Sequence, residues 1–221
     1  MLAKINVPMR SYGVSVFSQG YLNDGMLNES VVVYNSMRND GTPPVSFTYT
    51  ALLKGSASEM NVNLGRQLHG ESVKLGGFSV DLFVGNVLID MYIKCGCLDC
   101  GRRVFDEMPE RDIISWTSLI DAYAKAGEMG SASELFRELP EKDMVAWTAM
   151  VTGFVQNSKP REALEYFERM QNAGVQADEV TLVGVINACA QLGAAKYAHW
   201  VRDVAENSGF RLRTMCTWVR H

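Results

Sequence analysis

One segment of this sequence occurs twice, with its two copies 31 residues apart. Residues 114–120 read ISWTSLI and residues 145–151 read VAWTAMV, so that Trp116 and Trp147 occupy the same place in each copy. The stretch EMPERD at 107–112 recurs at the same offset as ELPEKD at 138–143. Self-similarity at a fixed period of about 20–50 residues is typical of repeat proteins. Each unusual residue must therefore be compared with its equivalents in the other repeats.

One period contains two helices. Residues 82–92 place apolar side chains at the 3.6-residue spacing of an amphipathic helix, and Gly96 follows where a glycine commonly ends a helix. Residues 98–108 carry a second apolar stripe, which Pro109 terminates. Each hairpin alone leaves an apolar face bare, and stacking on its neighbours buries that face. The sequence therefore predicts an all-α solenoid of helix-turn-helix repeats.

The same pattern divides most of the chain. We predict an N-terminal stub, five complete repeats, one partial repeat and an off-pattern tail, at residues 1–10, 11–45, 46–81, 82–112, 113–143, 144–178, 179–210 and 211–221. The resemblance between repeats stops after Phe210, where the tail has neither a repeat position nor the polar outer face that a terminal repeat needs. This break predicts a truncated or misread gene product.

Composition limits the possible functions. The net charge of −4 and the pI of about 5.4 argue against a strongly basic grip on nucleic acid. No run of about 18 apolar residues is present, so no transmembrane helix is predicted. Five cysteines, three of them crowded between Cys95 and Cys100, do not resemble a disulfide framework and favour a reducing compartment. The first 23 residues carry basic but no acidic side chains and weakly resemble an organellar transit peptide; alternatively, residues from 11 onward already form a repeat helix.

The repeats resemble those of the plant pentatricopeptide repeat (PPR) family, in particular its PLS subclass, whose repeats have several lengths. The matching stretches are VGNVLIDMYIKCG at 84–96 and GRRVFDEMPERD at 101–112 for the short motif, LGRQLHG at 64–70 for the long motif and REALEYFERM at 161–170 for the 35-residue motif. The order is P, L, S, S, P, L over about residues 11–210. The tetratricopeptide repeat is the nearest alternative, but its Trp-Leu-Gly-Tyr spacing is missing and the repeat lengths vary.

The resemblance implies a right-handed superhelical solenoid. It also implies binding of single-stranded RNA, with one base read by each repeat. In the family, the fifth and last residues of a repeat read the base edge together, and second residues of adjacent repeats stack on the base. The implied reading pairs are Asn86 with Asp112, Thr117 with Asp143, Thr148 with Asp178, and Thr50 with Asp81. The implied stacking residues are Phe83, Ile114, Val145 and Val180. The family's code assigns Asn/Asp to U and Thr/Asp to G, so residues 82–178 would read U-G-G.

Two alternatives concern these positions. Asn, Thr and Asp near helix starts are also ordinary capping residues. Lys94 and Lys125 lie at equivalent places late in the first helices, where they would either contact phosphates or form part of a solvated face. The resemblance implies no cofactor.

A second pattern imitates a catalytic site. His69 and Glu71, followed by Cys97 and Cys100, resemble the zinc deaminase signature, in which the Glu moves protons and the other three bind zinc. Both halves lie inside repeats, on different hairpins, and Gly96 stands where the signature has proline. The three crowded cysteines also lack a fourth zinc ligand in view. We therefore predict no metal site, no catalytic residue and no enzymatic activity.

The predicted function is sequence-specific binding of single-stranded RNA in a mitochondrion or chloroplast, with the mitochondrion preferred. In the family, PLS arrays select sites for RNA editing, so editing or processing here would need partner proteins acting in trans. The alternatives are a protein-interaction scaffold, which the negative charge favours, and a non-functional truncated fragment.

Overall fold

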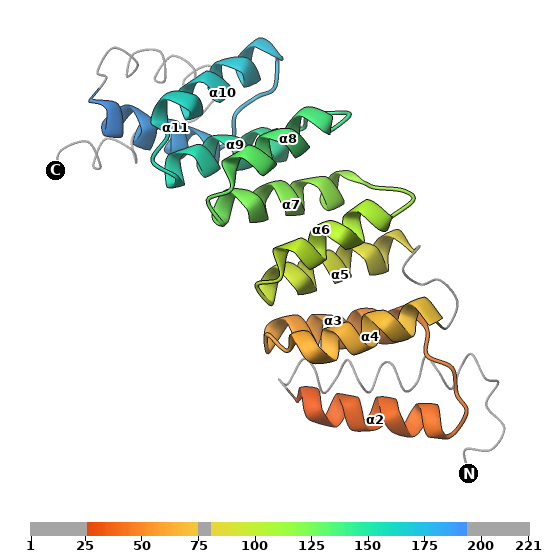
Figure 1. Cartoon of the computed structure of the whole chain (residues 1–221). Helices are drawn as coiled ribbons and strands as arrows, with labels where there is room; N and C mark the ends of the chain where they lie inside the picture. Colours follow the sequence, from red (N-terminus) through yellow and green to blue (C-terminus); the bar gives the residue numbers. More distant parts are fainter. Residues whose placement is uncertain (1–25, 75–80, 194–221) are drawn as a thin grey trace. The chain divides into compact units, whose positions relative to one another are not determined.

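The computed structural model describes residues 26–74 and 81–193, and every regular element within these two ranges is an α-helix. The helices are α2 (Leu27–Asn39), α3 (Ser46–Ser58), α4 (Val62–Lys74), α5 (Leu82–Lys94), α6 (Leu98–Glu107), α7 (Ile113–Lys125), α8 (Met129–Glu138), α9 (Met144–Gln156), α10 (Pro160–Asn172) and α11 (Glu179–Leu192). Short turns join them into successive hairpins (Figure 1). The predicted all-α class of helix-turn-helix repeats is thus confirmed.

The chain forms two compact units, residues 1–115 and 116–221, with the boundary inside α7. In the first unit, α3 packs against α2, α4 and α5, and α5 also packs against α4 and α6. In the second unit, α9 packs against α8, α10 and α11, and α10 packs against α11. The first helices of neighbouring repeats therefore lie side by side within each unit, α3 with α5 and α9 with α11.

The turn inside a hairpin needs a left-handed residue. Gly96 has a φ of +73°, and its N–H donates to the Ile93 carbonyl at 3.0 Å while the next N–H donates to the Tyr92 carbonyl at 2.9 Å. These bonds satisfy the last carbonyls of α5, and glycine adopts this conformation without a steric cost. Met60 and Ser158 adopt positive φ in the equivalent turns of the longer repeats, where no glycine signals the helix end.

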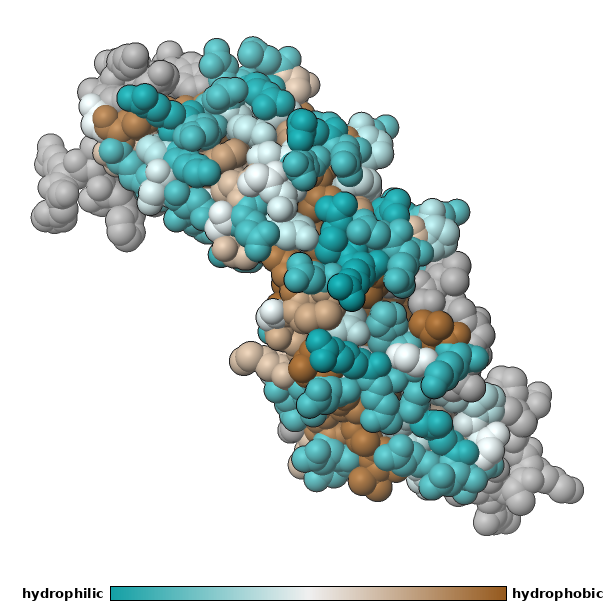
Figure 2. Space-filling view, viewed as in Figure 1, coloured by the Kyte–Doolittle hydropathy of each residue, from teal (hydrophilic) through white to brown (hydrophobic). Residues whose placement is uncertain are grey.

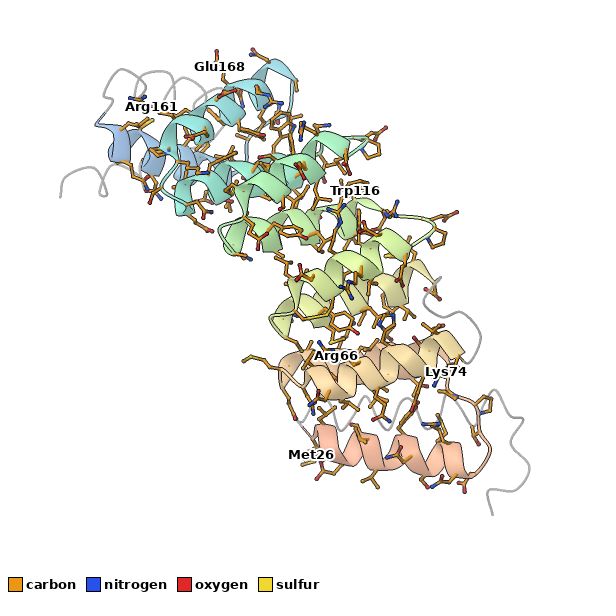
Figure 3. The ribbon with its side chains drawn as sticks, in the orientation of Figure 1. Met26, Arg66, Lys74, Trp116, Arg161 and Glu168 are labelled. Atoms are coloured by element: carbon orange, nitrogen blue, oxygen red, sulfur yellow. A yellow bond between two sulfur atoms is a disulfide. The ribbon has the colours of Figure 1, made fainter. Side chains whose placement is uncertain are left out.

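The core is built from equivalent apolar positions on the second helices. Phe105, Phe136 and Phe167 occupy one such position in three repeats, and each is at most 2% exposed. On α10, the labelled Arg161 and Glu168 project away from the neighbouring helices (Figure 3), and the visible surface of this helix is mostly hydrophilic (Figure 2). This polarity fits an amphipathic helix that buries one face.

Several predicted segments lie outside the described residues. They are the stub 1–10, the first part of the repeat 11–45, residues 75–80 of the repeat 46–81, the end of the partial repeat 179–210 and the tail 211–221. Of the helices in the described ranges, none combines the length and the apolar character needed to cross a membrane.

Candidate nucleic-acid interface

The first predicted reading pair is in direct contact in the first unit. The Asn86 side chain, on α5, donates through Nδ2 to Asp112, with its nitrogen 3.1 and 3.2 Å from the two carboxylate oxygens. The Ser115 hydroxyl lies 2.6 Å from Asn86 Oδ1 and 2.9 Å from Asp112 Oδ1. Three polar side chains from two repeats therefore form one network.

Asp112 also stabilises the start of α7. Its Oδ1 accepts a hydrogen bond from the Ser115 N–H at 2.9 Å, as a helix-capping side chain does. Burial alone would raise the pKa of this carboxyl group, but the hydrogen bonds from Ser115 and Asn86 outweigh burial and lower the pKa below its usual value. The carboxylate therefore stays ionised at neutral pH, although it is partly buried.

A similar network joins the third predicted pair in the second unit. The Thr148 hydroxyl lies 3.5 Å from Asp178 Oδ1 and 2.6 Å from the Thr181 hydroxyl. Asp178 in turn accepts hydrogen bonds from the Thr181 hydroxyl at 2.6 Å and from the Thr181 N–H at 2.7 Å. Asp178 thus caps α11 and lies beside the predicted partner residue of α9.

The other two predicted pairs differ from this arrangement. Asp143 caps α9 by accepting the Ala146 N–H at 2.9 Å, and Thr117 lies in the groove described below. Thr50 is only 3% exposed and donates its hydroxyl to the Phe47 carbonyl at 3.0 Å. Asp81 accepts instead from the Ser46 hydroxyl at 3.4 Å, so the structure does not bring this pair together as it does Asn86 and Asp112.

The predicted stacking residues are exposed apolar side chains. Phe83, Ile114, Val145 and Val180 each stand second in a helix and have exposed fractions between 51% and 57%. Phe47, which was not among the predicted stacking residues, is second in α3 and 40% exposed. The available signal was its position in the repeat, because Phe47 is the second residue of α3 just as Phe83 is the second residue of α5.

A shallow groove of about 390 Å³ gathers predicted site residues in the second unit. It is lined by Thr117, Ser118, Asp121, Val145, Thr148, Ala149, Thr152, Asp178 and Val180. Five of these were predicted, namely two reading threonines, one reading aspartate and two stacking valines. The groove therefore combines exposed apolar side chains with hydroxyl and carboxylate groups.

The two lysines predicted to contact phosphates each form an ion pair with an aspartate. Lys94 Nζ lies 2.9 Å from Asp90, and Lys125 Nζ lies 2.6 Å from Asp121, each one helical turn earlier. Both lysines remain more than half exposed. Each positive charge is thus paired with a negative one, which weakens the attraction of this face for phosphate.

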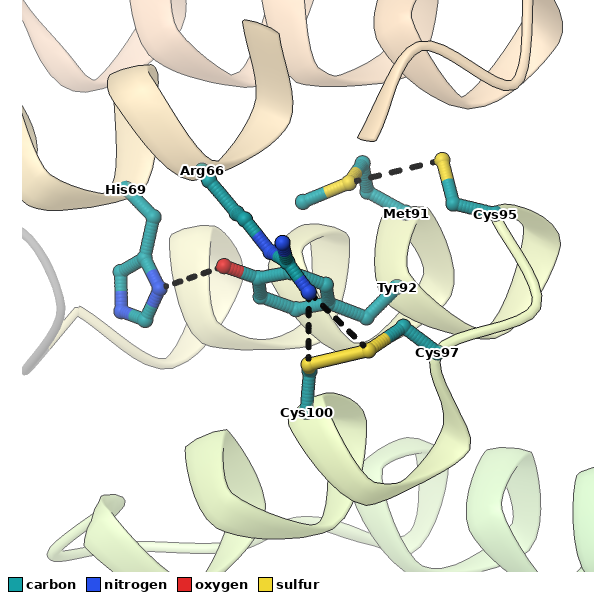
Figure 4. Close-up of a disulfide and its surroundings, with 7 residues drawn as sticks. All are labelled: Arg66, His69, Met91, Tyr92, Cys95, Cys97 and Cys100. Atoms are coloured by element: carbon teal, nitrogen blue, oxygen red, sulfur yellow. Dashed lines mark hydrogen bonds between the residues drawn. A yellow bond between two sulfur atoms is a disulfide. The ribbon is translucent and has the colours of Figure 1, made fainter. Parts of the chain in front are cut away.

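The residues that resemble a deaminase site make other contacts, which Figure 4 shows for His69, Cys97 and Cys100. His69 Nδ1 lies 3.0 Å from the Tyr92 hydroxyl, and burial lowers the pKa of His69, which favours the neutral ring. Among the described residues, no group of three potential metal ligands comes together. Glu71 accepts hydrogen bonds from Tyr34, from Arg38 at 2.7 Å and from Gln67 at 3.1 Å. These contacts give the histidine and the glutamate structural roles.

Cys97 and Cys100 form a disulfide, which differs from the expectation of unpaired cysteines. The reason is local, because α6 begins directly after Cys97 and its first turn brings the two Cα atoms to 5.4 Å, within the usual range for a disulfide. The Arg66 side chain of α4 lies 3.7 and 3.8 Å from the two sulfur atoms (Figure 4). Cys95 remains a free thiol.

The fold and the site define a class. This is a helical-hairpin repeat protein in which an exposed apolar residue stands second in α5, α7, α9 and α11, and in which a polar pair is in contact in two of the repeats. The family model described as PPR repeat matches residues 86–113 and 114–144. The family model described as PPR repeat family matches residues 142–191. The chain belongs to the pentatricopeptide repeat family.

Known proteins of this family are similar to much of the chain. Pentatricopeptide repeat-containing protein At2g20540 of Arabidopsis thaliana is 48% identical over 197 residues, which cover 89% of this chain and 37% of that protein. Protein At3g26630 of the same plant, described as chloroplastic, is 52% identical over 166 residues, which cover 75% of this chain and 36% of that protein. The chain spans between 12% and 37% of the length of the curated relatives considered.

A solved structure shares the fold. The crystal structure of the pentatricopeptide repeat protein PPR10, a maize protein, in complex with an 18-nt psaJ RNA element, has a TM-score of 0.64. It is 19% identical in sequence, and the match covers 88% of this chain and 29% of PPR10. This likeness supports the architecture of stacked helical hairpins.

Proposed function

We propose that this chain binds single-stranded RNA and that successive repeats over residues 82–178 read the bases U, G and G. The observation that carries the proposal is the groove of the second unit, where two reading threonines, a reading aspartate and two stacking valines line one surface. Exposed apolar side chains next to short polar ones suit a base, which has an apolar face and a hydrogen-bonding edge.

The chemistry of the pairs supports the assigned bases. Uracil presents one N–H donor between carbonyl acceptors, and the amide of Asn86 has both a donor and an acceptor to offer. Guanine presents N–H donors on its edge, and Thr148 beside the carboxylate of Asp178 offers acceptors. Asn86 and Thr148 are partly exposed, so a base edge can reach them. By analogy with base readout in DNA, each good pair would discriminate by about 1–3 kcal/mol.

The relatives support a wider role. One similar Arabidopsis protein is described as chloroplastic, and PPR10 was solved with RNA bound, which supports an RNA partner inside an organelle. As a PLS-type array, this chain would select sites on organellar transcripts for editing or processing. It would perform no chemistry itself and would act through partner proteins.

A protein-interaction scaffold is the second candidate function. Two observations favour it, the net charge of −4 and the pairing of Lys94 and Lys125 with aspartates. RNA binding through these repeats must rely on stacking and base edges more than on phosphate attraction.

The test is binding of the purified chain to a short single-stranded RNA containing U-G-G, compared with the same RNA after permutation of these bases. The informative variant is Asn86→Ala with Asp112→Ala, which removes one reading pair. The matched control is Asp106→Ala, which removes an exposed carboxylate of α6 that is paired only with Arg102.

We expect the wild type and the Asp106→Ala control to prefer the U-G-G RNA. The double variant should lose preference at U while it keeps its preference at the two G positions. No binding even at low salt would contradict the proposal and would favour the protein-interaction scaffold.

A further inference from the structure

Two cysteines that the repeat fold does not require stand at the start of α6. Cys97 comes directly before this helix, and Cys100 is the third residue inside it. In the next repeat, 31 residues later, the same two places are taken by Glu128 and Ser131, and α8 begins there in the same way. The architecture of the repeat therefore does not explain why two cysteines occur together here.

The disulfide between these cysteines can be reached from solvent. Cys97 and Cys100 are both half-buried, at the turn that joins α5 to α6 (Figure 4). The disulfide closes a very short loop, because only Leu98 and Asp99 lie between the two cysteines. Such a loop constrains the unfolded chain much less than a long one, so the bond adds little to stability. Accessible disulfides are also the ones that exchange with thiols, whereas structural disulfides resist reduction.

A positive charge from the neighbouring repeat lies against both sulfur atoms. Arg66 is on α4, and its Nη2 lies 3.7 Å from Cys97 Sγ and 3.8 Å from Cys100 Sγ. Over residues 26–74 and 81–193, Arg66 forms no ion pair with a carboxylate. An uncharged disulfide gains little from this guanidinium group, whereas a thiolate at the same place would be attracted to it.

The start of α6 favours the same charged form. The N-terminus of a helix carries a partial positive charge, which stabilises a cysteine thiolate placed there. The carboxylate of Asp99 in the first turn opposes this effect, but it is exposed and therefore screened by solvent. The guanidinium of Arg66 and the helix N-terminus thus both stabilise the reduced pair once one of its thiols ionises.

Cys95, two residues before Cys97, lies in a different environment. Its Sγ is 3.9 Å from the Ser56 carbonyl oxygen and 3.9 Å from the Met91 sulfur, and burial raises the pKa of its thiol. A thiol with a raised pKa stays protonated and reacts slowly. Cys95 therefore provides an internal reference for the reactivity of the other two cysteines.

We propose that Cys97 and Cys100 form a reversible thiol–disulfide exchange site, in which Arg66 stabilises the thiolate of the reduced state. The substrate class is a low-molecular-weight thiol such as glutathione. The site is one of modification and not of catalysis, and it does not depend on RNA binding. It also explains how a disulfide can belong to a chain whose cysteine content favours a reducing compartment.

The exchange consists of two balanced steps. The thiolate of one glutathione attacks one sulfur of the disulfide, and the bond between Cys97 and Cys100 breaks. Its electron pair leaves on the other sulfur, which becomes a thiolate beside Arg66. A second glutathione thiolate then attacks the glutathione sulfur of the mixed disulfide and releases the remaining cysteine. The protein gains two electrons, two glutathione molecules become one glutathione disulfide, and their two protons pass to the cysteines or to water.

The experiment equilibrates the full chain with mixtures of reduced and oxidised glutathione, followed by acid quenching and alkylation. Mass spectrometry of the peptide that carries Cys97 and Cys100 measures the reduced fraction. The test variant is Arg66→Gln. One control is Arg161→Gln, which removes an exposed positive charge in the second unit, and the other is Cys95→Ser, which removes the neighbouring thiol. Thermal unfolding of each variant establishes that it is folded.

We expect the wild-type pair to titrate between the reduced and the oxidised form across these mixtures. Arg66→Gln should lower the equilibrium constant for reduction by about threefold to tenfold, because the thiolate loses a positive charge close to it. In the reduced chain, one cysteine of the pair should react with iodoacetamide faster than Cys95, and Arg66→Gln should slow only that reaction. Both controls should keep the wild-type equilibrium constant.

Three results would overturn the proposal. A pair that stays fully oxidised in every mixture is a structural disulfide, and a pair that stays fully reduced forms no disulfide in the presence of glutathione. An equilibrium constant that Arg66→Gln leaves unchanged would show that the guanidinium group does not act on the thiolate. Because none of these measurements uses RNA, their failure is distinguishable from a failure of the proposed RNA binding.

Discussion

Asn86 Nδ2 lies 3.1 and 3.2 Å from the two carboxylate oxygens of Asp112, although the two residues are 26 positions apart in the sequence. The same carboxylate caps α7 through the Ser115 N–H. Helix capping and the proposed base reading are therefore compatible roles of one side chain. Because capping holds Asp112 in place, the reading pair exists before any ligand binds, and little side-chain entropy remains to be lost on binding.

The exposed ring of Phe83 should matter for RNA affinity. Phe83 is 56% exposed, and Lys54 Nζ lies 5.6 Å from the centre of its ring. Base–aromatic stacking is worth about 1–3 kcal/mol, so Phe83→Ala should weaken binding of the U-G-G RNA by about that amount. Titration of fluorescently labelled RNA measures this loss. The free energy of unfolding should change by only about 0.5 kcal/mol, because the substitution lies at the surface.

Phe105→Ala is the matched control, since Phe105 is only 2% exposed. Truncation of a buried phenylalanine costs about 3–5 kcal/mol of folding stability. Urea unfolding should therefore separate the two variants clearly. Full RNA affinity in Phe83→Ala would show that the second helical residue does not stack on a base in this repeat.

Removal of the aspartates that pair with the two lysines should strengthen RNA binding. Asp90→Asn with Asp121→Asn releases Lys94 and Lys125 from ion pairs of 2.9 and 2.6 Å and removes two negative charges. We expect affinity to rise by about threefold to tenfold at low salt, with a steeper dependence on salt concentration. Addition of Lys94→Ala and Lys125→Ala to this variant should abolish the gain. Equal affinity in the wild type and the Asn variant would place the lysines away from the RNA.

Local sequence signals were sufficient to predict the helices. The apolar stripe over 82–92 belongs to α5, Leu82–Lys94, and the stripe over 98–108 belongs to α6, Leu98–Glu107. These boundaries are set by short-range features, namely the 3.6-residue period, Gly96 and Pro109. The turns at Met60 and Ser158 were harder to predict from the sequence, because a non-glycine residue adopts positive φ only when the surrounding structure requires it.

Contacts between repeats were harder to predict. Thr50 and Thr148 occupy the same position in their repeats, yet Thr50 is buried and Thr148 lies in the groove, because burial depends on the neighbouring hairpin. Two other contacts had a local signal in the sequence. Asp90 precedes Lys94 by four residues, the spacing of a helical ion pair. Ser115 follows Asp112 by three, the spacing of a helix cap and its N3 residue.

Glu71 should contribute stability that depends on pH. Burial would raise the pKa of Glu71, but hydrogen bonds from Tyr34 and Gln67 and the charge of Arg38 outweigh burial and lower it. A carboxylate with a lowered pKa stabilises the fold above its unfolded value of about 4.3, and this contribution is lost as the pH falls through the folded value. Glu71→Gln should therefore cost about 1–2 kcal/mol at pH ~7 and less near pH ~3.

The measurement is the free energy of urea unfolding of the wild type and Glu71→Gln at both pH values. Asp106→Asn serves as the control, because its ion pair with Arg102 is solvent-exposed and should contribute less than about 1 kcal/mol at either pH. If Glu71→Gln lowers the free energy of unfolding equally at both pH values, the negative charge of Glu71 does not stabilise the contact between α2 and α4.

The contact between α7 and α9 should be sensitive to a single methyl group. A Cβ added at Gly153 of α9 would lie 2.7 Å from the Cβ of Ala124 on α7, and neither group can rotate away. Gly153→Ala should therefore cost about 1–3 kcal/mol, because the two helices must separate. Gly130→Ala is the matched control in α8, where a Cβ meets no atom within 4 Å, and it should stabilise the fold by about 0.5 kcal/mol. Thermal unfolding of the two variants measures the difference. A Gly153→Ala protein as stable as the wild type would show that α7 and α9 lie far enough apart to accept the methyl group.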